Sequence, residues 1–264
     1  MCRLVAYHGP KTSLERLVVE PAHSLLVQSQ EAHEAKLAVN GDGFGIAWYD
    51  TLAEPGIFKD VFPAWSDSNL PSICRMVRSH LFLAHVRAST EGETSRTNCH
   101  PFINGVWSFM HNGGIGDFQL IRRELEALLN EKDYLAKRGS TDSELFFLLM
   151  ITNGLSENPS RAVSKTIDQC LELMKTKRPK HRPLRLTIVF SDGQALYGFR
   201  YASDSKCPTL YMSQGKAFAG TVLASEPLDG MPENWQTIAP NQLVSISINR
   251  VHKEQIKPLN MVTA

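Results

Sequence analysis

Met1-Cys2-Arg3-Leu4-Val5-Ala6-Tyr7, at the start of the chain, places a cysteine directly before a β-prone segment. The alternation over Arg3–Tyr7 predicts a short strand. Removal of Met1, expected when the next side chain is small, would leave Cys2 with a thiol and a free α-amine. An α-amine has an unperturbed pKa of roughly 7.7–8.0, so it can accept the thiol proton near neutral pH and return it to a leaving group. Taken alone, Cys2 fits an ordinary residue at a frayed terminus better than a nucleophile, and the rest of the chain has to decide between the two.

The composition is that of a soluble globular protein. The chain has 264 residues, of which 42% are hydrophobic and 21% are charged, which is enough to bury a core. A formal net charge of +1 gives no electrostatic reason to expect nucleic acid or a membrane surface as partner. No apolar run approaches the ~20 residues of a transmembrane helix, and there is no secretory signal. We therefore expect a cytoplasmic protein with no nucleic-acid and no membrane partner.

The cysteines and histidines do not have the spacing of a metal site. The five cysteines are scattered and form no Cys-x-x-Cys pair, which argues against a disulfide framework and a structural zinc site. The histidines that were weighed as ligands lack helical metal-ligand spacing, so core or turn positions suit them better. These histidines are His8, His33, His85, His100 and His111. The sequence predicts no metal.

Strand-like segments enclose a helical middle. Early strands are expected at Arg3–Tyr7, Gly43–Tyr49, Leu81–Arg87 and Trp107–His111, with a polar loop at Gln28–Asn40. Helices are expected at Leu14–Val18, Pro71–Arg78, Phe118–Leu129, Ser140 through Thr152 and Ser160–Lys175. Later strands are expected at Leu186–Phe190, Ala195–Tyr201, Thr209–Ser213, Ala217–Ala224 and Gln242–Asn249. This order favours an α+β fold with antiparallel sheets over a doubly wound parallel sheet. The basic stretch Lys175–Arg185 is expected to be a solvated surface loop.

Two motifs at strand ends can serve a thiol that attacks an amide. In Ala84-His85-Val86-Arg87, an arginine leaves a buried strand, and its guanidinium can bind a carboxylate bidentately. The alternative is a structural arginine paired with an internal acid. In His111-Asn112-Gly113-Gly114, the Asn112 amide and the Gly113 backbone N–H can form an oxyanion hole. The alternative is a hairpin turn, because Asn-Gly is a strong turn signal.

A third motif, Ser140-Thr141-Asp142-Ser143-Glu144, begins a predicted helix. Thr141 or Ser140 with Glu144 matches a capping box. Asp142 can bind a substrate ammonium at this helix start. The alternative is a simple helix cap, which is common.

Together and in this order, the motifs resemble the class II (N-terminal nucleophile) glutamine amidotransferases over most of the chain. The resemblance also rests on three further motifs, Gly41-Asp42-Gly43-Phe44-Gly45-Ile46, Asn98-Cys99-His100-Pro101-Phe102 and Ala224-Ser225-Glu226-Pro227. The chain is most similar to the small stand-alone branch that includes enzymes cleaving γ-glutamyl amide bonds. The resemblance implies a single class II glutamine amidotransferase-type domain over residues 1–264. It also implies a four-layer αββα fold with two stacked, mainly antiparallel sheets.

The resemblance assigns a role to six residues. Cys2 would be the nucleophile with its α-amine as general base, and Asn112 with the Gly113 backbone N–H would form the oxyanion hole. Arg87, with Thr90, would hold the glutamine α-carboxylate, and Asp142 would hold the α-ammonium. The residue chemistry agrees, since a zwitterionic head needs one cation and one anion. No metal and no organic cofactor is implied.

The chain departs from the synthase-linked members of the family. Ala88 and Glu91 flank Ser89-Thr90, where those members often carry an aromatic residue and a histidine, so Thr90 is less firmly placed than Arg87. No sugar isomerase, phosphoribosyltransferase or synthetase domain follows. Ammonia released here would therefore go to a separate ammonia-accepting synthase subunit, or water would be the acceptor.

We expect an amidohydrolase that cleaves the γ-amide of glutamine or of a γ-glutamyl compound through a Cys2 thioester. The rival hypothesis is a non-catalytic sensor or regulatory subunit that keeps the fold and binds glutamine or a γ-glutamyl ligand. A sensor needs Arg87 and Asp142 but not a terminal thiol.

Overall fold

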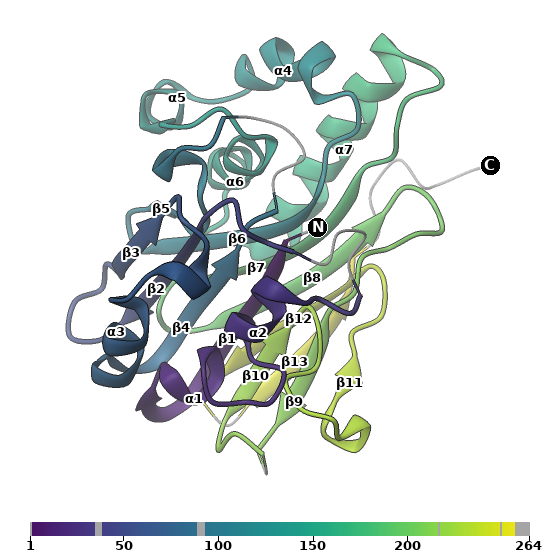
Figure 1. The fold of residues 1–264 in the computed structure, drawn as a ribbon. Helices are drawn as coiled ribbons and strands as arrows, with labels where there is room; N and C mark the ends of the chain where they lie inside the picture. Colours follow the sequence, from purple (N-terminus) through teal and green to yellow (C-terminus); the bar gives the residue numbers. More distant parts are fainter. Residues whose placement is uncertain (1, 35–38, 89–92, 216, 249, 257–264) are drawn as a thin grey trace.

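Two antiparallel sheets lie face to face, and helices cover their outer faces (Figure 1). The structure is a computed structural model that describes residues 2–34, 39–88, 93–215, 217–248 and 250–256. The first sheet has the order β11-β9-β10-β1-β4-β2-β3 and the second has the order β13-β12-β8-β7-β6-β5. This arrangement confirms the predicted α+β class and its four αββα layers.

The strands of the first sheet are β1 (Arg3–Ser13), β2 (Phe44–Tyr49), β3 (Gly56–Asp60), β4 (Arg78–Val86), β9 (Tyr211–Gln214), β10 (Thr221–Ala224) and β11 (Gln236–Thr237). Those of the second are β5 (Phe102–Asn104), β6 (Trp107–Gly114), β7 (Arg185–Ser191), β8 (Leu196–Ala202), β12 (Gln242–Ser247) and β13 (Arg250–Gln255). The helices against the first sheet are α1 (Glu15–Val18), α2 (Leu25–Gln30) and α3 (Leu70–Met76). Those against the second are α4 (Phe118–Glu126), α5 (Glu131–Ala136), α6 (Asp142–Thr152) and α7 (Pro159–Lys177).

Three buried cores fill the three spaces between the four layers. Within β1, Val5 and Tyr7 pack toward α1–α3, whereas Leu4 and Ala6 pack between the sheets. Successive side chains of a strand point to opposite faces, so a strand buried on both faces needs an unbroken apolar run. The third core joins the second sheet to α4–α7. The sheets are also tied by Tyr49, whose hydroxyl lies 2.9 Å from Ser108 Oγ.

Helix α6 lies in the middle of its layer. Thr141 is its N-cap and accepts a hydrogen bond from the Glu144 backbone N–H (3.2 Å). Every residue from Ser143 to Met150 is buried, as expected for a helix that is enclosed by a sheet and by other helices. Its first residues meet the end of β6, which is where the candidate site forms. No helix among the described residues combines the length and apolar character needed to cross a bilayer.

The sequence located most elements but missed the short ones. The expected loop at Gln28–Asn40 is wrong at its start, because α2 extends through Gln30. Helix α5 and the strands β3, β5, β11 and β13 were not predicted. The strand expected at Trp107–His111 continues to Gly114, where it pairs with β7. Asn112-Gly113 is therefore not a hairpin turn, because the ladder with β7 overrides the local turn preference.

Candidate active site

Strand alternation brings the predicted nucleophile and the predicted oxyanion donor into the same space. Leu4 and Ala6 of β1 face the core between the sheets, so Cys2 points the same way. In β6, Met110 lies in that core and Asn112 follows on the same face. Both residues line a cavity of about 300 Å³ at the ends of these strands.

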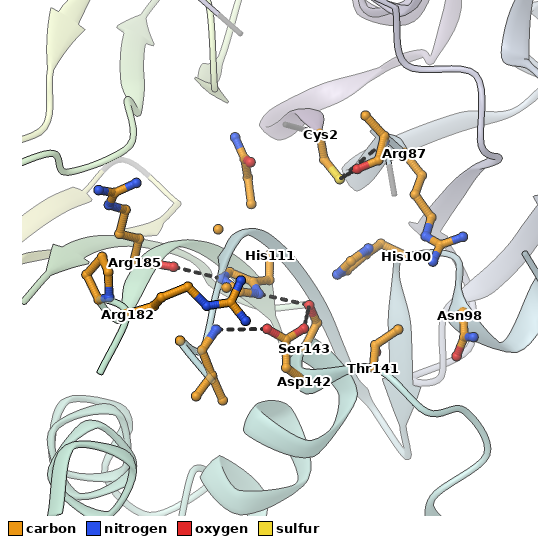
Figure 2. Close-up of a pocket in the computed structure, with 17 residues that line it drawn as sticks. Cys2, Arg87, Asn98, His100, His111, Thr141, Asp142, Ser143, Arg182 and Arg185 are labelled. Atoms are coloured by element: carbon orange, nitrogen blue, oxygen red, sulfur yellow. Dashed lines mark hydrogen bonds between the residues drawn. The ribbon is translucent and has the colours of Figure 1, made fainter. Parts of the chain in front are cut away.

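Five of the six predicted site residues line this cavity. They are Cys2, Arg87, Asn112, Gly113 and Asp142. Figure 2 shows that they come from different elements, with Cys2 and Arg87 on one side and Asp142 on the other. Thr90 lies outside the described residues. The fold thus gathers groups that are up to 140 positions apart in the sequence.

The Cys2 thiol is partly buried and contacts the backbone of Ala88. Its Sγ lies 3.6 Å from the Ala88 carbonyl oxygen and 3.5 Å from the Ala88 nitrogen. Burial raises the pKa of the Cys2 thiol, and the hydrogen bond from Ala88 and the positive charge of Arg87 offset this only in part. The thiol is therefore protonated at neutral pH, so nucleophilic attack from Cys2 requires a base.

A buried ion pair anchors the backbone of Cys2. Arg3 Nε donates to the Cys2 carbonyl oxygen (2.7 Å), and Arg3 Nη1 donates to Glu226 Oε1 (2.6 Å). Both side chains are only 1% exposed. Burial raises the pKa of the Glu226 carboxyl, but hydrogen bonds from His23 and from the Glu34 backbone and the charge of Arg3 outweigh it, so the pKa lies below its ordinary value. Glu226 thereby fixes the strand that carries Cys2.

Glu226 also belongs to a group of three potential metal ligands with His23 and His33. Its Oε2 accepts from His23 Nε2 (2.8 Å) and from the His33 backbone N–H (3.0 Å). Its Oε1 accepts from Arg3 and from the Glu34 backbone N–H (2.8 Å). Each carboxylate oxygen already accepts two hydrogen bonds, so this geometry favours a structural role for Glu226 over metal binding.

The Asn112 side chain is buried and has no described partner. It is 1% exposed, and neither its nitrogen nor its oxygen has a hydrogen-bond partner among the described residues. Leaving a buried amide unsatisfied costs about 1–3 kcal/mol, which a substrate oxygen could recover. The adjacent Gly113 has φ +147°, and a Cβ there would lie 1.9 Å from the Arg185 carbonyl oxygen. Only glycine fits this position.

Asp142 holds its carboxylate at the cavity while neighbouring residues cap the helix. Its Oδ2 accepts from the Ile115 backbone N–H (2.9 Å), and its Oδ1 accepts from Ser143 Oγ (3.2 Å). The Glu144 carboxylate accepts from the backbone N–H groups of Arg138 and Gly139 (2.8 and 2.7 Å). Glu144 therefore does not close a capping box with Thr141, and the predicted box is only half correct.

Arg87 follows β4 directly, and its backbone extends the pairing with β2. Its N–H donates to Gly43 O (2.8 Å), and its carbonyl accepts from the Asp42 N–H (3.0 Å). Arg87 is 4% exposed, and its Nη1 donates to the Asp42 carbonyl oxygen (3.4 Å). Asp42 belongs to the glycine turn that precedes β2, and β2 pairs with β4, so this turn lies beside Arg87.

Two histidines that residue spacing assigned to the core or to turns line the cavity. His100 is 4% exposed, and neither ring nitrogen has a described partner. Burial lowers the pKa of His100 well below its ordinary value, so the ring is neutral. His111 Nδ1 lies 2.8 Å from Ser143 Oγ. The signal for His100 was present in the Asn98-Cys99-His100-Pro101-Phe102 motif, without an assigned role.

The basic stretch Lys175–Arg185 is not wholly a solvated surface loop. Arg182, Pro183 and Arg185 line the cavity. Ion pairs hold the stretch there, among them Arg182 with Asp117 and Arg185 with Asp204. No local sequence signal indicates this placement, since Asp117 lies 65 positions from Arg182.

Three comparisons agree on one family. Residues 17–212 match the model described as glutamine amidotransferases class-II, a match that begins after Cys2. The chain is 33% identical to the probable glutamine amidotransferase DUG3 of Saccharomyces cerevisiae, covering 93% of this chain and 82% of that protein. It is 36% identical to the gamma-glutamyl-hercynylcysteine sulfoxide hydrolase of Mycobacterium tuberculosis H37Rv, covering 94% and 93%. It superposes on a glutamine aminotransferase class-II domain protein of Silicibacter pomeroyi with a TM-score of 0.76 at 34% identity, covering 97% and 100%.

Loss of the Glu226 charge is expected to destabilise the fold. Glu226→Ala leaves Arg3 buried and uncompensated, which should lower the free energy of unfolding by about 3–5 kcal/mol in urea titrations. Asp50→Ala is the control, because it removes an exposed pair with Lys11 and should cost at most about 1 kcal/mol. Equal effects of the two substitutions would contradict the role given to Glu226.

The same ion pair predicts a pH dependence. The folded-state pKa of Glu226 lies below its ordinary value of 4.5. The ionised carboxylate therefore contributes fully to the free energy of unfolding above about pH 4.5. This contribution is lost as the pH falls through the folded-state pKa. The stability gap between the wild type and Glu226→Gln should therefore shrink below pH 4.5. A gap that stays constant down to acid unfolding would count against this linkage.

Proposed function

Because the chain belongs to the class II glutamine amidotransferases, we propose that it hydrolyses a γ-glutamyl amide bond through a Cys2 thioester. The substrate is glutamine or a γ-glutamyl compound, and no metal or organic cofactor takes part. The observation that carries the proposal is the buried, unpartnered Asn112 amide, which lines the same cavity as the Cys2 thiol. A protein that only bound a ligand would have no need for these two groups together.

In the acylation step, the α-amine of Cys2, exposed by removal of Met1, takes the thiol proton. The sulfur attacks the γ-carbonyl carbon, and the developing oxyanion accepts hydrogen bonds from Asn112 Nδ2 and the Gly113 N–H. The carbon–nitrogen bond then breaks, and the leaving nitrogen takes the proton from the α-ammonium. The glutamyl group is now held as a thioester.

In the deacylation step, water gives a proton to the α-amine and attacks the thioester carbon. The carbon–sulfur bond breaks, glutamate leaves, and the proton returns to the sulfur. The raised pKa of the Cys2 thiol makes the base necessary, since little thiolate exists at neutral pH. Attack and proton removal therefore have to be coupled.

The glutamyl head is bound by opposite charges. Arg87 binds its α-carboxylate together with Thr90, and Asp142 binds its α-ammonium. The Ile115 N–H and the Ser143 hydroxyl hold the Asp142 carboxylate in place, so little side-chain entropy is lost on binding. The neutral His100 lines the same cavity.

Water is favoured as the acceptor over a partner synthase. The hydrolases named among the relatives match this chain over nearly their whole length, and the substrate in their name is a γ-glutamyl compound. Assays of ammonia or amine release from glutamine and from γ-glutamyl amides separate the two possibilities. Turnover of free glutamine alone would favour a separate ammonia-accepting synthase subunit.

Cys2 is expected to form a covalent adduct with a glutamine-like electrophile, such as the diazoketone analogue of glutamine. Intact mass should show one adduct per chain, lost in Cys2→Ala and in protein that retains Met1. Cys207→Ala is the matched control, because Cys207 is also partly buried but lies outside the cavity. Tight binding without an adduct would instead support the non-catalytic sensor.

Asn112→Ala should lower kcat by about 10²–10³-fold with little change in KM, because one oxyanion donor is lost. Steady-state kinetics of amine release measure both constants. Asn104→Ala on β5, outside the cavity, should leave both unchanged. A purely KM effect of Asn112→Ala would place the amide in ground-state binding.

Arg87→Gln and Asp142→Asn should each raise KM by on the order of tenfold or more, since each removes a charge-assisted hydrogen bond to the substrate head. The kcat should change less than KM. Arg96→Gln, an exposed arginine paired with Asp60, is the control. Unchanged KM in both variants would refute the assignment of the head group.

A further inference from the structure

We propose that His111 is a positioning residue for the substrate α-ammonium and that it acts on Asp142 through the Ser143 hydroxyl. A neutral His111 ring keeps the proton of that hydroxyl and leaves Asp142 Oδ1 open to the ammonium. A protonated ring turns the hydroxyl toward Asp142 Oδ1 and places a positive charge beside it. This inference rests on the proposed function and adds to it a proton-linked control of substrate binding.

The three side chains form one chain of hydrogen bonds at the wall of the cavity. His111 Nδ1 lies 2.8 Å from Ser143 Oγ, and Ser143 Oγ lies 3.2 Å from Asp142 Oδ1. On the other side of the ring, His111 Nε2 lies 3.3 Å from the Arg185 carbonyl oxygen. Figure 2 shows these contacts running from β7 to the start of α6. All three residues line the cavity, so the chain ends at the carboxylate that would meet the substrate.

A neutral ring does not carry enough protons to satisfy this chain. The Arg185 carbonyl can only accept, so it requires a proton on His111 Nε2. A neutral ring then has no proton at Nδ1, which accepts the single proton of the Ser143 hydroxyl. The other neutral tautomer would set two acceptors against each other, 3.3 Å apart. Only a protonated ring donates from both nitrogens and frees the Ser143 hydroxyl to donate to Asp142.

The Asp142 carboxylate itself keeps its place in both states. Its Oδ2 accepts from the Ile115 backbone N–H (2.9 Å), a bond that does not involve His111. His111 and Ser143 are 2% and 6% exposed, so the Ser143 hydroxyl is expected to donate to one of its two protein acceptors. Rotation of this hydroxyl is therefore enough to open or to cover Asp142 Oδ1.

Opposing effects set the charge of the ring. Burial lowers the pKa of His111, and the Asp142 charge and the hydrogen bond to the Arg185 carbonyl raise it, so that the pKa lies below its ordinary value of 6.5. His111 is therefore neutral at neutral pH, and Asp142 Oδ1 is open. As the pH falls through the His111 pKa, the ring becomes a cation and opposes the binding of a second cation at Asp142.

The other ionisable groups around His111 keep their charge state over this pH range. His85 Nε2 contacts the His111 carbonyl oxygen (3.4 Å), and burial lowers the pKa of His85 to about 3. Burial also lowers the pKa of His100 well below its ordinary value, so both rings stay neutral. The remaining ionisable side chains of the cavity are the protonated thiol of Cys2 and the guanidinium groups of Arg87, Arg182 and Arg185.

The test compares L-γ-glutamyl-p-nitroanilide with glutaryl-p-nitroanilide, which differ only in the α-ammonium. The ratio of their kcat/KM values cancels titrations that both reactions share, such as that of the Cys2 α-amine. In the wild type this ratio should fall on the order of tenfold between about pH 7 and about pH 5, which corresponds to one charge-assisted hydrogen bond. In His111→Gln, whose side chain cannot take up a proton, the ratio should stay constant.

His80→Gln is the matched control. His80 Nε2 also contacts a backbone carbonyl, that of Gly193 (3.1 Å), but His80 lies outside the cavity. The wild-type fall of the ratio should persist in this variant. A constant ratio in the wild type, or an equal fall in His111→Gln, would remove His111 from ammonium binding while leaving the hydrolase intact.

Ser143→Ala separates the hydroxyl from the charge of the ring. The fall of the ratio should become smaller without disappearing, because the imidazolium charge remains. A fall as large as in the wild type would assign the effect to the charge alone and overturn the part given to Ser143.

A titration of the ring needs no turnover and no His111 variant that folds. The Cε1–H signal of His111 in the wild type is followed by NMR with L-glutamate or with glutarate, which lacks the ammonium. Because coupling between two binding events is reciprocal, glutamate should lower the His111 pKa by about one pH unit and glutarate should not. An unchanged pKa with glutamate, or equal shifts with both ligands, would refute the inference. Absence of turnover of either nitroanilide, with no adduct on Cys2, would refute the proposed function, whereas the titration still decides the role of His111.

Discussion

The ion pair between Arg3 and Glu226 joins parts of the chain that are 223 positions apart. Removing two charges from water costs several kcal/mol per ion, so a buried pair is retained only where its geometry is well satisfied. Here the carboxylate also accepts from two backbone N–H groups and from His23, and the guanidinium reaches the Cys2 carbonyl. The main effect of the ion pair is therefore to position the backbone, because it holds the first strand, the segment after α2 and the end of β10 together.

The candidate site inherits its rigidity from that arrangement. Cys2 precedes β1, Arg87 follows β4, Asn112 lies in β6, and Asp142 begins α6. None of these side chains depends on a long loop for its position. Groups held by packed strands and helix starts lose little freedom when a ligand binds.

The sequence predicted the elements whose patterns are strong. β1 and β7 are buried on both faces and are rich in β-prone residues, and the start of α6 carries a recognisable cap in Thr141. Short or exposed elements such as β13 and α5 carry too few apolar residues to stand out. At Asn112-Gly113 the local turn signal was misleading, because pairing with β7 decides the backbone there.

The sequence identified cavity-lining residues whose chemistry suits one task. It missed those whose position depends on contacts between distant parts of the chain. Arg87 and Asp142, predicted as the opposite charges that a zwitterionic head would need, both line the cavity. Arg182 was missed because its place depends on Asp117, a contact that no local pattern announces. His100 was passed over because its spacing excluded a metal, although it is buried and lines the cavity.

Burial raises the pKa of each of the five cysteine thiols, Cys2 included. Peroxides and alkylating agents react with thiolates rather than with thiols. The buried Cys74, Cys99 and Cys170 are therefore expected to react slowly with such reagents at neutral pH.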